Sequence, residues 1–163
     1  MTRTLSSIHL RTYLETHAIP GEILHLALPT PTVESAAQAV NAQVEQIVKS
    51  ILFLLPDRPV LAVTCGMLPI ERRSIAAHCG VGRKRVKLAE AASVLAIAGY
   101  AVGAMPPFGH RQPLYTLLDP QVLSHKEVFA GGGEDHALLH IDPQYILQFS
   151  NATTLNLHTH PSS

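Results

Sequence analysis

The chain has 163 residues, of which 47% are hydrophobic and 15% are charged, and its 12 basic residues balance its 12 acidic residues. The length suits one domain with a buried core, and the composition excludes a disordered chain. No apolar run approaches the roughly 20 residues that a membrane helix needs, and the amphipathic N-terminal segment is unlike a secretion signal. We therefore expect a soluble cytoplasmic protein in which Cys65 and Cys79 are free thiols.

Hydrophobic spacing and chain-breaking residues predict short helices mixed with short strands. Thr32 is suited to begin a helix, Pro69 to lie in a first helical turn, and Gly80 to end that helix. Pro56-Asp57-Arg58-Pro59 predicts a turn between two strands. The expected elements are a helix over 5–18, a strand over 23–28, a helix over 33–40, strands over 46–55 and 60–65, a helix over 69–79, a strand over 85–88, a helix over 90–98, strands over 114–118, 127–130 and 137–141, and a helix over 142–147.

These elements do not alternate strictly between strand and helix. The sequence therefore predicts one α/β or α+β domain over residues 1–163 with a mixed sheet. The tail over 150–163 is polar, and we expect it to fray.

The basic residues are unevenly distributed. Half of them lie between positions 72 and 87, in a stretch without Asp or Glu. Such a cluster can bind a few phosphate groups although the whole chain is neutral. A solvated helix face followed by a charged loop explains the same pattern. The residues are Arg72, Arg73, Arg83, Lys84, Arg85 and Lys87.

Lys49 interrupts the segment Gln46-Ile-Val-Lys-Ser-Ile-Leu-Phe-Leu-Leu55, where apolar residues stand on both sides of Lys49 and Ser50. A strand that is apolar on both faces is typical of a central strand, in which a lysine loses much of its hydration. Proteins seldom accept this cost unless the ammonium reaches an anion, a carbonyl oxygen or a cleft. The alternative is a lysine near the start of the strand whose side chain extends to solvent.

Two glycine-containing segments are further candidates for a binding site. In Gly103-Ala-Met-Pro-Pro107, glycine permits close approach of the backbone and proline stiffens it, which suits selection of a small substrate. In Gly131-Gly-Gly-Glu-Asp-His136, glycine amides can form a concave anion site, and His136 could bind substrate or transfer a proton. The alternatives are an ordinary turn for the first segment and a flexible hairpin turn with a surface histidine for the second.

The usual motifs for phosphate binding and nucleophilic hydrolysis are missing. The sequence contains no Walker motif, no GxGxxG after a strand and no Gly-x-Ser-x-Gly elbow. The ten histidines do not complete a metal site, because His136 and His140 lack the intervening Glu of a zinc-protease helix and no Cys or Asp cluster joins them. We therefore expect neither a metal nor a cofactor.

Four segments, taken in order, resemble the YbaK/aminoacyl-tRNA synthetase-associated domain family. This family contains free-standing trans-editing deacylases and the editing domain inserted in bacterial prolyl-tRNA synthetases. The resemblance covers residues 22–149 and implies a mixed α/β fold around a curved, barrel-like sheet surrounded by helices. The segments are Thr32-Val-Glu-Ser-Ala-Ala37, Gln46-Ile-Val-Lys-Ser-Ile-Leu-Phe53, Gly103-Ala-Met-Pro-Pro-Phe-Gly109 and Glu127-Val-Phe-Ala-Gly-Gly-Gly-Glu134.

The resemblance also implies roles for single residues. Lys49 matches the family's functional lysine, and Ser50 keeps the hydroxyl of the threonine that often follows it. Gly103 and Pro107 match a Gly-x-x-x-Pro loop, in which Ala104-Met105 replaces the commoner Gly-Val. Gly131 to Gly133 match the glycine-rich segment that lines the pocket, and His136 falls near a position where some members have a functional histidine.

These observations predict an aminoacyl-tRNA deacylase that hydrolyses the ester of mischarged tRNA in trans, with an aminoacyl-tRNA synthetase as a further partner. Ester hydrolysis needs a placed water and donors for the oxyanion, and in this family the terminal ribose hydroxyl of the tRNA is thought to help. The alternatives are an inactive RNA-binding or regulatory module of the same fold and a hydrolase of small esters. The predicted site comprises Lys49, Gly131, Gly132 and His136 for catalysis, Ser50, Gly103, Ala104, Met105, Pro107 and Gly133 for substrate binding, and Arg83, Lys84, Arg85 and Lys87 for tRNA binding.

Overall fold

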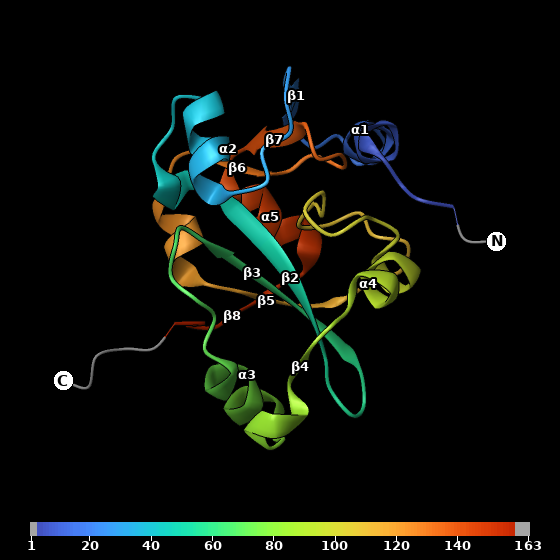
Figure 1. Cartoon of the computed structure of the whole chain (residues 1–163), viewed down its shortest axis with the longest axis vertical. Helices are drawn as coiled ribbons and strands as arrows, with labels where there is room; N and C mark the ends of the chain where they lie inside the picture. The colour runs from blue at the N-terminus through green and yellow to red at the C-terminus, as the bar shows by residue number, and fades with distance from the viewer. Residues whose placement is uncertain (1–2, 159–163) are drawn as a thin grey trace.

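The computed structural model describes residues 3–158, and it confirms the mixed α/β class (Figure 1). The strands are β1 (Glu22–His25), β2 (Val48–Leu54), β3 (Pro59–Cys65), β4 (Lys87–Leu88), β5 (Tyr115–Leu118), β6 (Val128–Gly131), β7 (Ala137–Ile141) and β8 (Thr153–Thr154). They form a three-stranded sheet in the order β1-β7-β6 and a five-stranded sheet in the order β4-β2-β3-β5-β8. The two sheets meet at a parallel bridge between Ile47 and Phe129.

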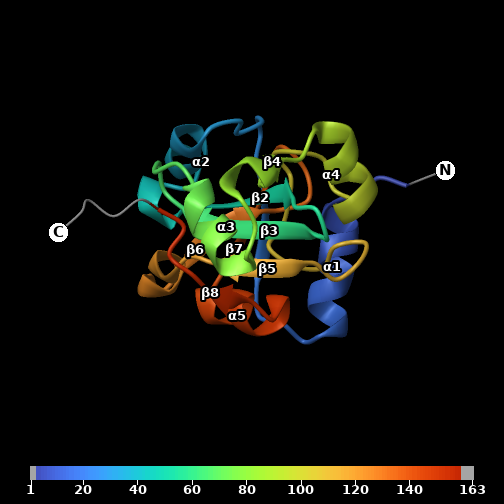
Figure 2. The same ribbon diagram turned by 90° about the horizontal axis from the view of Figure 1, so that it is seen from below.

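Short helices surround the sheets, as Figure 2 shows from the side of α3. They are the α-helices α1 (Ser7–Thr16), α2 (Val33–Ala39), α3 (Arg72–Cys79), α4 (Ala91–Ala98) and α5 (Pro143–Ser150) and the 3-10 helices η1 (Val44–Gln46), η2 (Arg83–Arg85) and η3 (Pro120–Ser124). None of the helices within residues 3–158 is long and apolar enough to span a membrane.

The helix ends follow the predicted capping residues in two of three places. Thr32 precedes α2 and accepts a hydrogen bond from the Ser35 amide at 3.0 Å. Gly80 ends α3 with a left-handed φ of 69°. The predicted start at Pro69 is wrong, because the amide of Glu71 donates to the carbonyl of Leu157 and α3 begins only after this contact.

The β2–β3 hairpin separates two apolar clusters, which explains why its strands are apolar on both faces. Leu52 and Leu61 belong to the larger cluster, and Phe53 and Val60 belong to the cluster under α3. This alternation between neighbouring residues is the two-residue repeat of a strand buried on both sides. Cys65 is a buried free thiol, and burial raises its pKa to about 11.

The prediction of a frayed tail is wrong for residues 150–158. β8 pairs with β5 in parallel, and the Leu157 side chain is fully buried. His158 Nδ1 donates to the carbonyl of Pro69, and its Nε2 lies 2.7 Å from Thr64 Oγ1. The carboxylate of Asp119 accepts from the amide of Leu157. Long-range contacts therefore fix this polar segment, and the remaining predicted tail, 159–163, lies outside the described residues.

Candidate functional site

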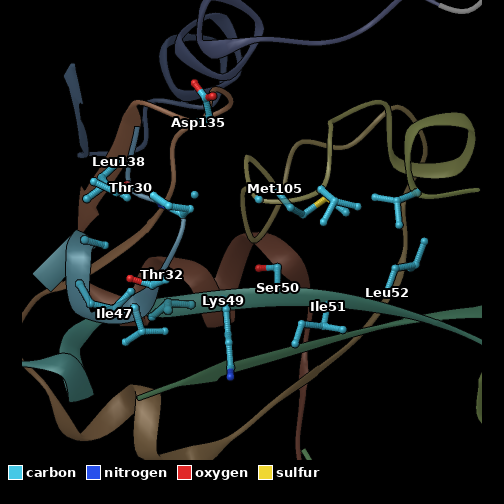
Figure 3. Close-up of a pocket in the computed structure, with 18 of the residues that line it drawn as sticks. Thr30, Thr32, Ile47, Lys49, Ser50, Ile51, Leu52, Met105, Asp135 and Leu138 are labelled. Atoms are coloured by element: carbon cyan, nitrogen blue, oxygen red, sulfur yellow. The ribbon is translucent and has the colours of Figure 1, made fainter. Parts of the chain in front are cut away.

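A cavity of about 310 Å³ lies along β2, between α2 and the segment that follows α4 (Figure 3). Apolar side chains make up most of its wall, which is typical of a site for a small ligand. Five of the predicted site residues line the cavity, and these are Lys49, Ser50, Gly103, Met105 and Gly131. Ala104, Pro107, Gly132, Gly133, His136 and the four predicted tRNA-binding residues do not line it.

The cavity opens where β2 lacks a neighbouring strand. β3 accompanies β2 along its whole length, whereas β4 pairs only with Phe53 and Leu54. Just before the other end of β2, Ile47 forms a parallel bridge with Phe129 of β6. Around Lys49 and Ser50, β2 is therefore an open edge, because this part of the strand lies between the positions where β4 and β6 contact it.

The main chain of Ser50 faces this edge. The carbonyl of Ile47 accepts from Gly66 on the β3 side, and the carbonyl of Leu52 accepts from Ala89 on the opposite side. Because peptide groups alternate in direction along a strand, the N–H and C=O of Ser50 point to the same side as the Leu52 carbonyl. The Ser50 hydroxyl is buried and has no hydrogen-bond partner in the described part of the chain. Ser50 thus offers unsatisfied polar groups to a ligand.

Lys49 extends from the other face of β2. Figure 3 shows its ammonium on the side opposite to the Ser50 hydroxyl and Met105. Lys49 is half-buried, lies opposite Thr64 of β3, and makes no ion pair with any carboxylate within residues 3–158. The open edge explains why a lysine is tolerated in a strand with two buried faces, and it leaves the charge available to an anion.

The Gly103–Pro107 loop covers the Ser50 side of the cavity. Gly103 has a left-handed φ of 87° and is exposed, whereas residues 104–107 are buried. His110 Nε2 donates to the carbonyl of Pro106 at 2.7 Å. Burial lowers the pKa of His110 to about 4, against a smaller opposing effect of this hydrogen bond, so the ring is neutral near pH 7. These contacts hold Met105 against the cavity.

The three glycines of 131–133 position this loop. A Cβ on Gly131 would lie 2.1 Å from the carbonyl oxygen of Met105, so only glycine permits the contact. The amide of Gly132 donates to Ala137, and the amide of Gly133 donates to the carbonyl of Ala104 at 2.9 Å. Both amides are engaged within the protein, which differs from the concave anion site expected from the sequence. Close packing explains all three glycines, because a Cβ on Gly131 would meet this loop, one on Gly132 would meet Ala137, and one on Gly133 would meet the backbone of Ser6 and Ser7.

Asp135 lines the cavity, although the sequence analysis did not single it out. Its carboxylate accepts a hydrogen bond from His136 Nδ1 at 2.9 Å. This bond, with a smaller contribution from Glu134, raises the pKa of His136. His136 is therefore joined to the cavity through Asp135, whose position two residues after the glycine run is the signal that could have identified it. Thr30, whose amide donates to the Asp135 carbonyl, also lines the cavity and was likewise missed.

The basic segment, defined as Arg83, Lys84, Arg85 and Lys87, lies near the C-terminal end of β2, where Lys87 pairs with Leu54. All four side chains are exposed, and none has an ion-pair partner among the described residues. The guanidinium of Arg72 donates to the carbonyl of Val86 and so anchors the segment to α3. Leu88 and Ala89, which follow the segment directly, line the cavity.

Comparisons with known proteins agree with this arrangement. The model of the aminoacyl-tRNA editing domain matches residues 28–149. The structure of a candidate trans-editing enzyme for prolyl-tRNA synthetase is 30% identical, with a TM-score of 0.86 over 94% of this chain and 97% of the other. A scaffold from epitope grafting by computational design is 29% identical, with a TM-score of 0.87 over 95% and 97% of the two chains.

A further relative is the uncharacterised protein YwhH of Bacillus subtilis (strain 168). It is 23% identical over 131 residues, which cover 80% of this chain and 82% of the relative. The family match spans most of the chain and includes every residue that lines the cavity. The chain therefore belongs to the aminoacyl-tRNA editing domain family.

Proposed function

We propose that this protein hydrolyses, in trans, the ester bond of mischarged aminoacyl-tRNA. The observation that carries the proposal is the open edge of β2, where Ser50 presents unpartnered polar groups on one face and Lys49 an unpaired ammonium on the other. A protein of the editing family needs donors for the ester carbonyl and a cation for the phosphate, and this edge offers both.

The two faces of β2 suggest where each part of the substrate binds. We place the acyl group on the Ser50 side, where the wall includes Met105, Val94 and Leu138 and suits an uncharged side chain. We place the phosphate of the terminal nucleotide at Lys49, because the ammonium extends from the other face. The ester then lies across the edge of the strand, next to the main chain of Ser50.

Hydrolysis at this position needs no covalent enzyme intermediate. Water adds to the ester carbonyl carbon, and the developing oxyanion accepts hydrogen bonds from the Ser50 amide and hydroxyl. The bond from the carbonyl carbon to the ribose oxygen then breaks, and the proton lost by the water is transferred to that oxygen, with the neighbouring ribose hydroxyl as relay. The free amino acid and the uncharged tRNA are the products. In this proposal Asp135 and His136 lie at the rim and influence the charge at the entrance.

The remaining proposed contacts lie outside the cavity. The basic segment is unpaired and exposed, so we assign it to phosphates of the tRNA acceptor arm. Because charged tRNA is made and used in the cytoplasm, we place the activity there. An aminoacyl-tRNA synthetase is the natural source of the mischarged substrate and a candidate partner.

Single-turnover deacylation tests the proposal directly. A panel of alanyl-, cysteinyl- and seryl-tRNA should include at least one substrate that the wild type hydrolyses well above the spontaneous rate. Ser50→Ala should slow that reaction about a hundredfold, since loss of one oxyanion donor typically costs a factor of at least this size. Ser124→Ala, which removes an exposed hydroxyl outside the cavity, is the matched control. Faster turnover of simple aminoacyl esters than of every charged tRNA would indicate a small-ester hydrolase, and no turnover of either would indicate a binding module.

A further inference from the structure

The face of β2 that carries Lys49 also carries apolar side chains that the proposed acyl site does not use. Side chains alternate between the faces of a strand, and cross-strand partners share a face. Lys49 and Ile51 therefore lie on the face opposite to Ser50, as Figure 3 shows. Leu88 of β4 pairs with Phe53 of β2, which places Leu88 on the same face.

Ile51 and Leu88 together form a surface that we call the apolar platform. Both residues line the cavity, Ile51 is half-buried, and Leu88 is 55% exposed. Because Leu88 lies opposite Phe53, Ile51 is its diagonal neighbour, at about 7–8 Å between Cα atoms. Leu88 is exposed at the cavity itself, so its apolar side chain is accessible to a ligand bound there.

The charges around the apolar platform indicate which kind of ligand it fits. Lys49 stands two residues before Ile51, about 7 Å along the strand, and the basic segment directly precedes Leu88. Neither Lys49 nor the basic segment has an ion-pair partner within residues 3–158. An apolar surface between unpaired cations is complementary to a nucleotide, which combines a flat base with an anionic backbone.

We propose that the apolar platform is the binding surface for the base of the terminal nucleotide. This inference rests on the proposed function, because it assigns the nucleoside part of the same substrate. The base packs against Ile51 and Leu88, its own phosphate meets Lys49, and the basic segment meets phosphates farther along the acceptor arm. The ribose then lies at the edge of β2, from which the acyl group reaches Ser50 on the other face.

Binding of two small probes tests this base-binding surface without any hydrolysis. Adenosine 5′-monophosphate represents the terminal nucleotide, and ribose 5-phosphate lacks only the base. Titrations followed by NMR should show the wild type binding the nucleotide about tenfold more tightly than the sugar phosphate. Leu88→Ala should weaken nucleotide binding about fivefold and leave sugar-phosphate binding unchanged, whereas Leu88→Trp should strengthen nucleotide binding because an aromatic ring stacks on the base.

Leu28→Ala provides the matched control. Leu28 is 74% exposed and does not line the cavity, so the same truncation there should leave both affinities unchanged. Three results would overturn the assignment of the base to the apolar platform. These are equal affinity of the wild type for the two probes, an unchanged preference for the nucleotide in Leu88→Ala, and equal weakening of the binding of both probes in that variant. Neither probe carries an aminoacyl ester, so these outcomes are independent of the deacylation assay. A protein that binds the nucleotide through Leu88 but hydrolyses no charged tRNA would overturn the proposed function alone.

Discussion

The two ends of β2 differ in their neighbours, and this difference separates stability from function. At the closed end, Phe53 and Leu54 are paired with β3 on one side and β4 on the other. At the open end, Lys49 and Ser50 are paired with β3 alone and face the cavity. A strand that is central at one end and an edge at the other can thus contribute to the core and also present main-chain groups to a ligand.

The largest effect should come from the closed end. Phe53→Ala should lower the free energy of unfolding by about 3–5 kcal/mol, because Phe53 is 4% exposed and its removal leaves a cavity under α3. Urea unfolding measures this change. The deacylation rate per folded molecule should stay within a few-fold of wild type. A rate loss as large as that of a Lys49 variant would mean that the two ends do not act separately.

Lys49→Ala should have the opposite effect. Deacylation should fall at least tenfold, about 1.4 kcal/mol in the barrier. The melting temperature should be unchanged or slightly higher, since a half-buried unpaired charge is removed. Lys49→Arg should restore little activity, because a planar guanidinium does not replace a compact ammonium. Lys126→Ala, an exposed lysine outside the cavity, is the control, and near-wild-type rates in Lys49→Ala would refute the assignment of the open end.

Gly103→Val tests the loop that covers the open end. A Cβ at Gly103 meets nothing within 4 Å, but the φ of 87° is strained for valine. We expect about a fivefold loss of deacylation, together with a stability loss of about 1–2 kcal/mol from the backbone strain. Gly80→Val is a matched control, since Gly80 also has a left-handed φ and open space but lies away from the cavity. Equal loss of activity in both variants would show that strain alone is responsible.

The basic segment should contribute to the binding of tRNA but not to the hydrolysis of the ester. Replacing Lys84 and Arg85 with Ala should raise the KM for charged tRNA several-fold and reduce the slope of log affinity against log salt by roughly 1.5. Hydrolysis of aminoacyl-adenosine should be unaffected, because this substrate lacks the upstream phosphates. Kinetics on both substrates at several salt concentrations measure the effect. Equal losses on both would show that the segment supports the fold.

The smallest effect concerns the pH dependence of stability. Burial lowers the pKa of His110 to about 4, whereas an unfolded histidine titrates near 6.5. The unfolded chain therefore binds this proton first, so the contribution of His110 is present above pH 6.5 and is lost as the pH falls toward 4. His110→Gln, which keeps a donor for Pro106 but does not titrate, should flatten the melting temperature between pH 7 and 4.5. A melting temperature of His110→Gln that falls as steeply as that of the wild type over this pH range would contradict the assignment.

Local signals predicted the parts of the fold that depend on neighbouring residues. The cap at Thr32, the turn at residues 56–59 and the helix end at Gly80 were identified because each requires a specific residue type at a specific backbone conformation. The segment over 150–158 was mistaken for a frayed tail because its order comes from Asp119, Thr64 and Pro69, which are distant in sequence. No local pattern carries that information.

Only part of the candidate site was predicted, because some of its features follow from local sequence and others depend on long-range contacts. Lys49 and Ser50 stood out as polar residues in an apolar strand, and both line the cavity. The opposite directions of their side chains follow from strand alternation, but the open edge depends on where β4 and β6 end. Asp135 was missed, and the amides of Gly132 and Gly133 were assigned to an anion, because the contact between β6 and the loop at Ala104 is long-range.

The position of β8 has a consequence for biosynthesis. The five-stranded sheet contains two parallel pairs, β3 with β5 and β5 with β8, and the second requires residues 153 and 154. Domains generally fold from the N-terminus during synthesis, and contacts between distant residues form late. On the ribosome, the β2–β3 hairpin can form early, but the cluster around Leu157 stays incomplete until residues 153–158 emerge. Until then the nascent chain exposes the apolar side chains of this cluster, and chaperone binding should be strongest during that interval.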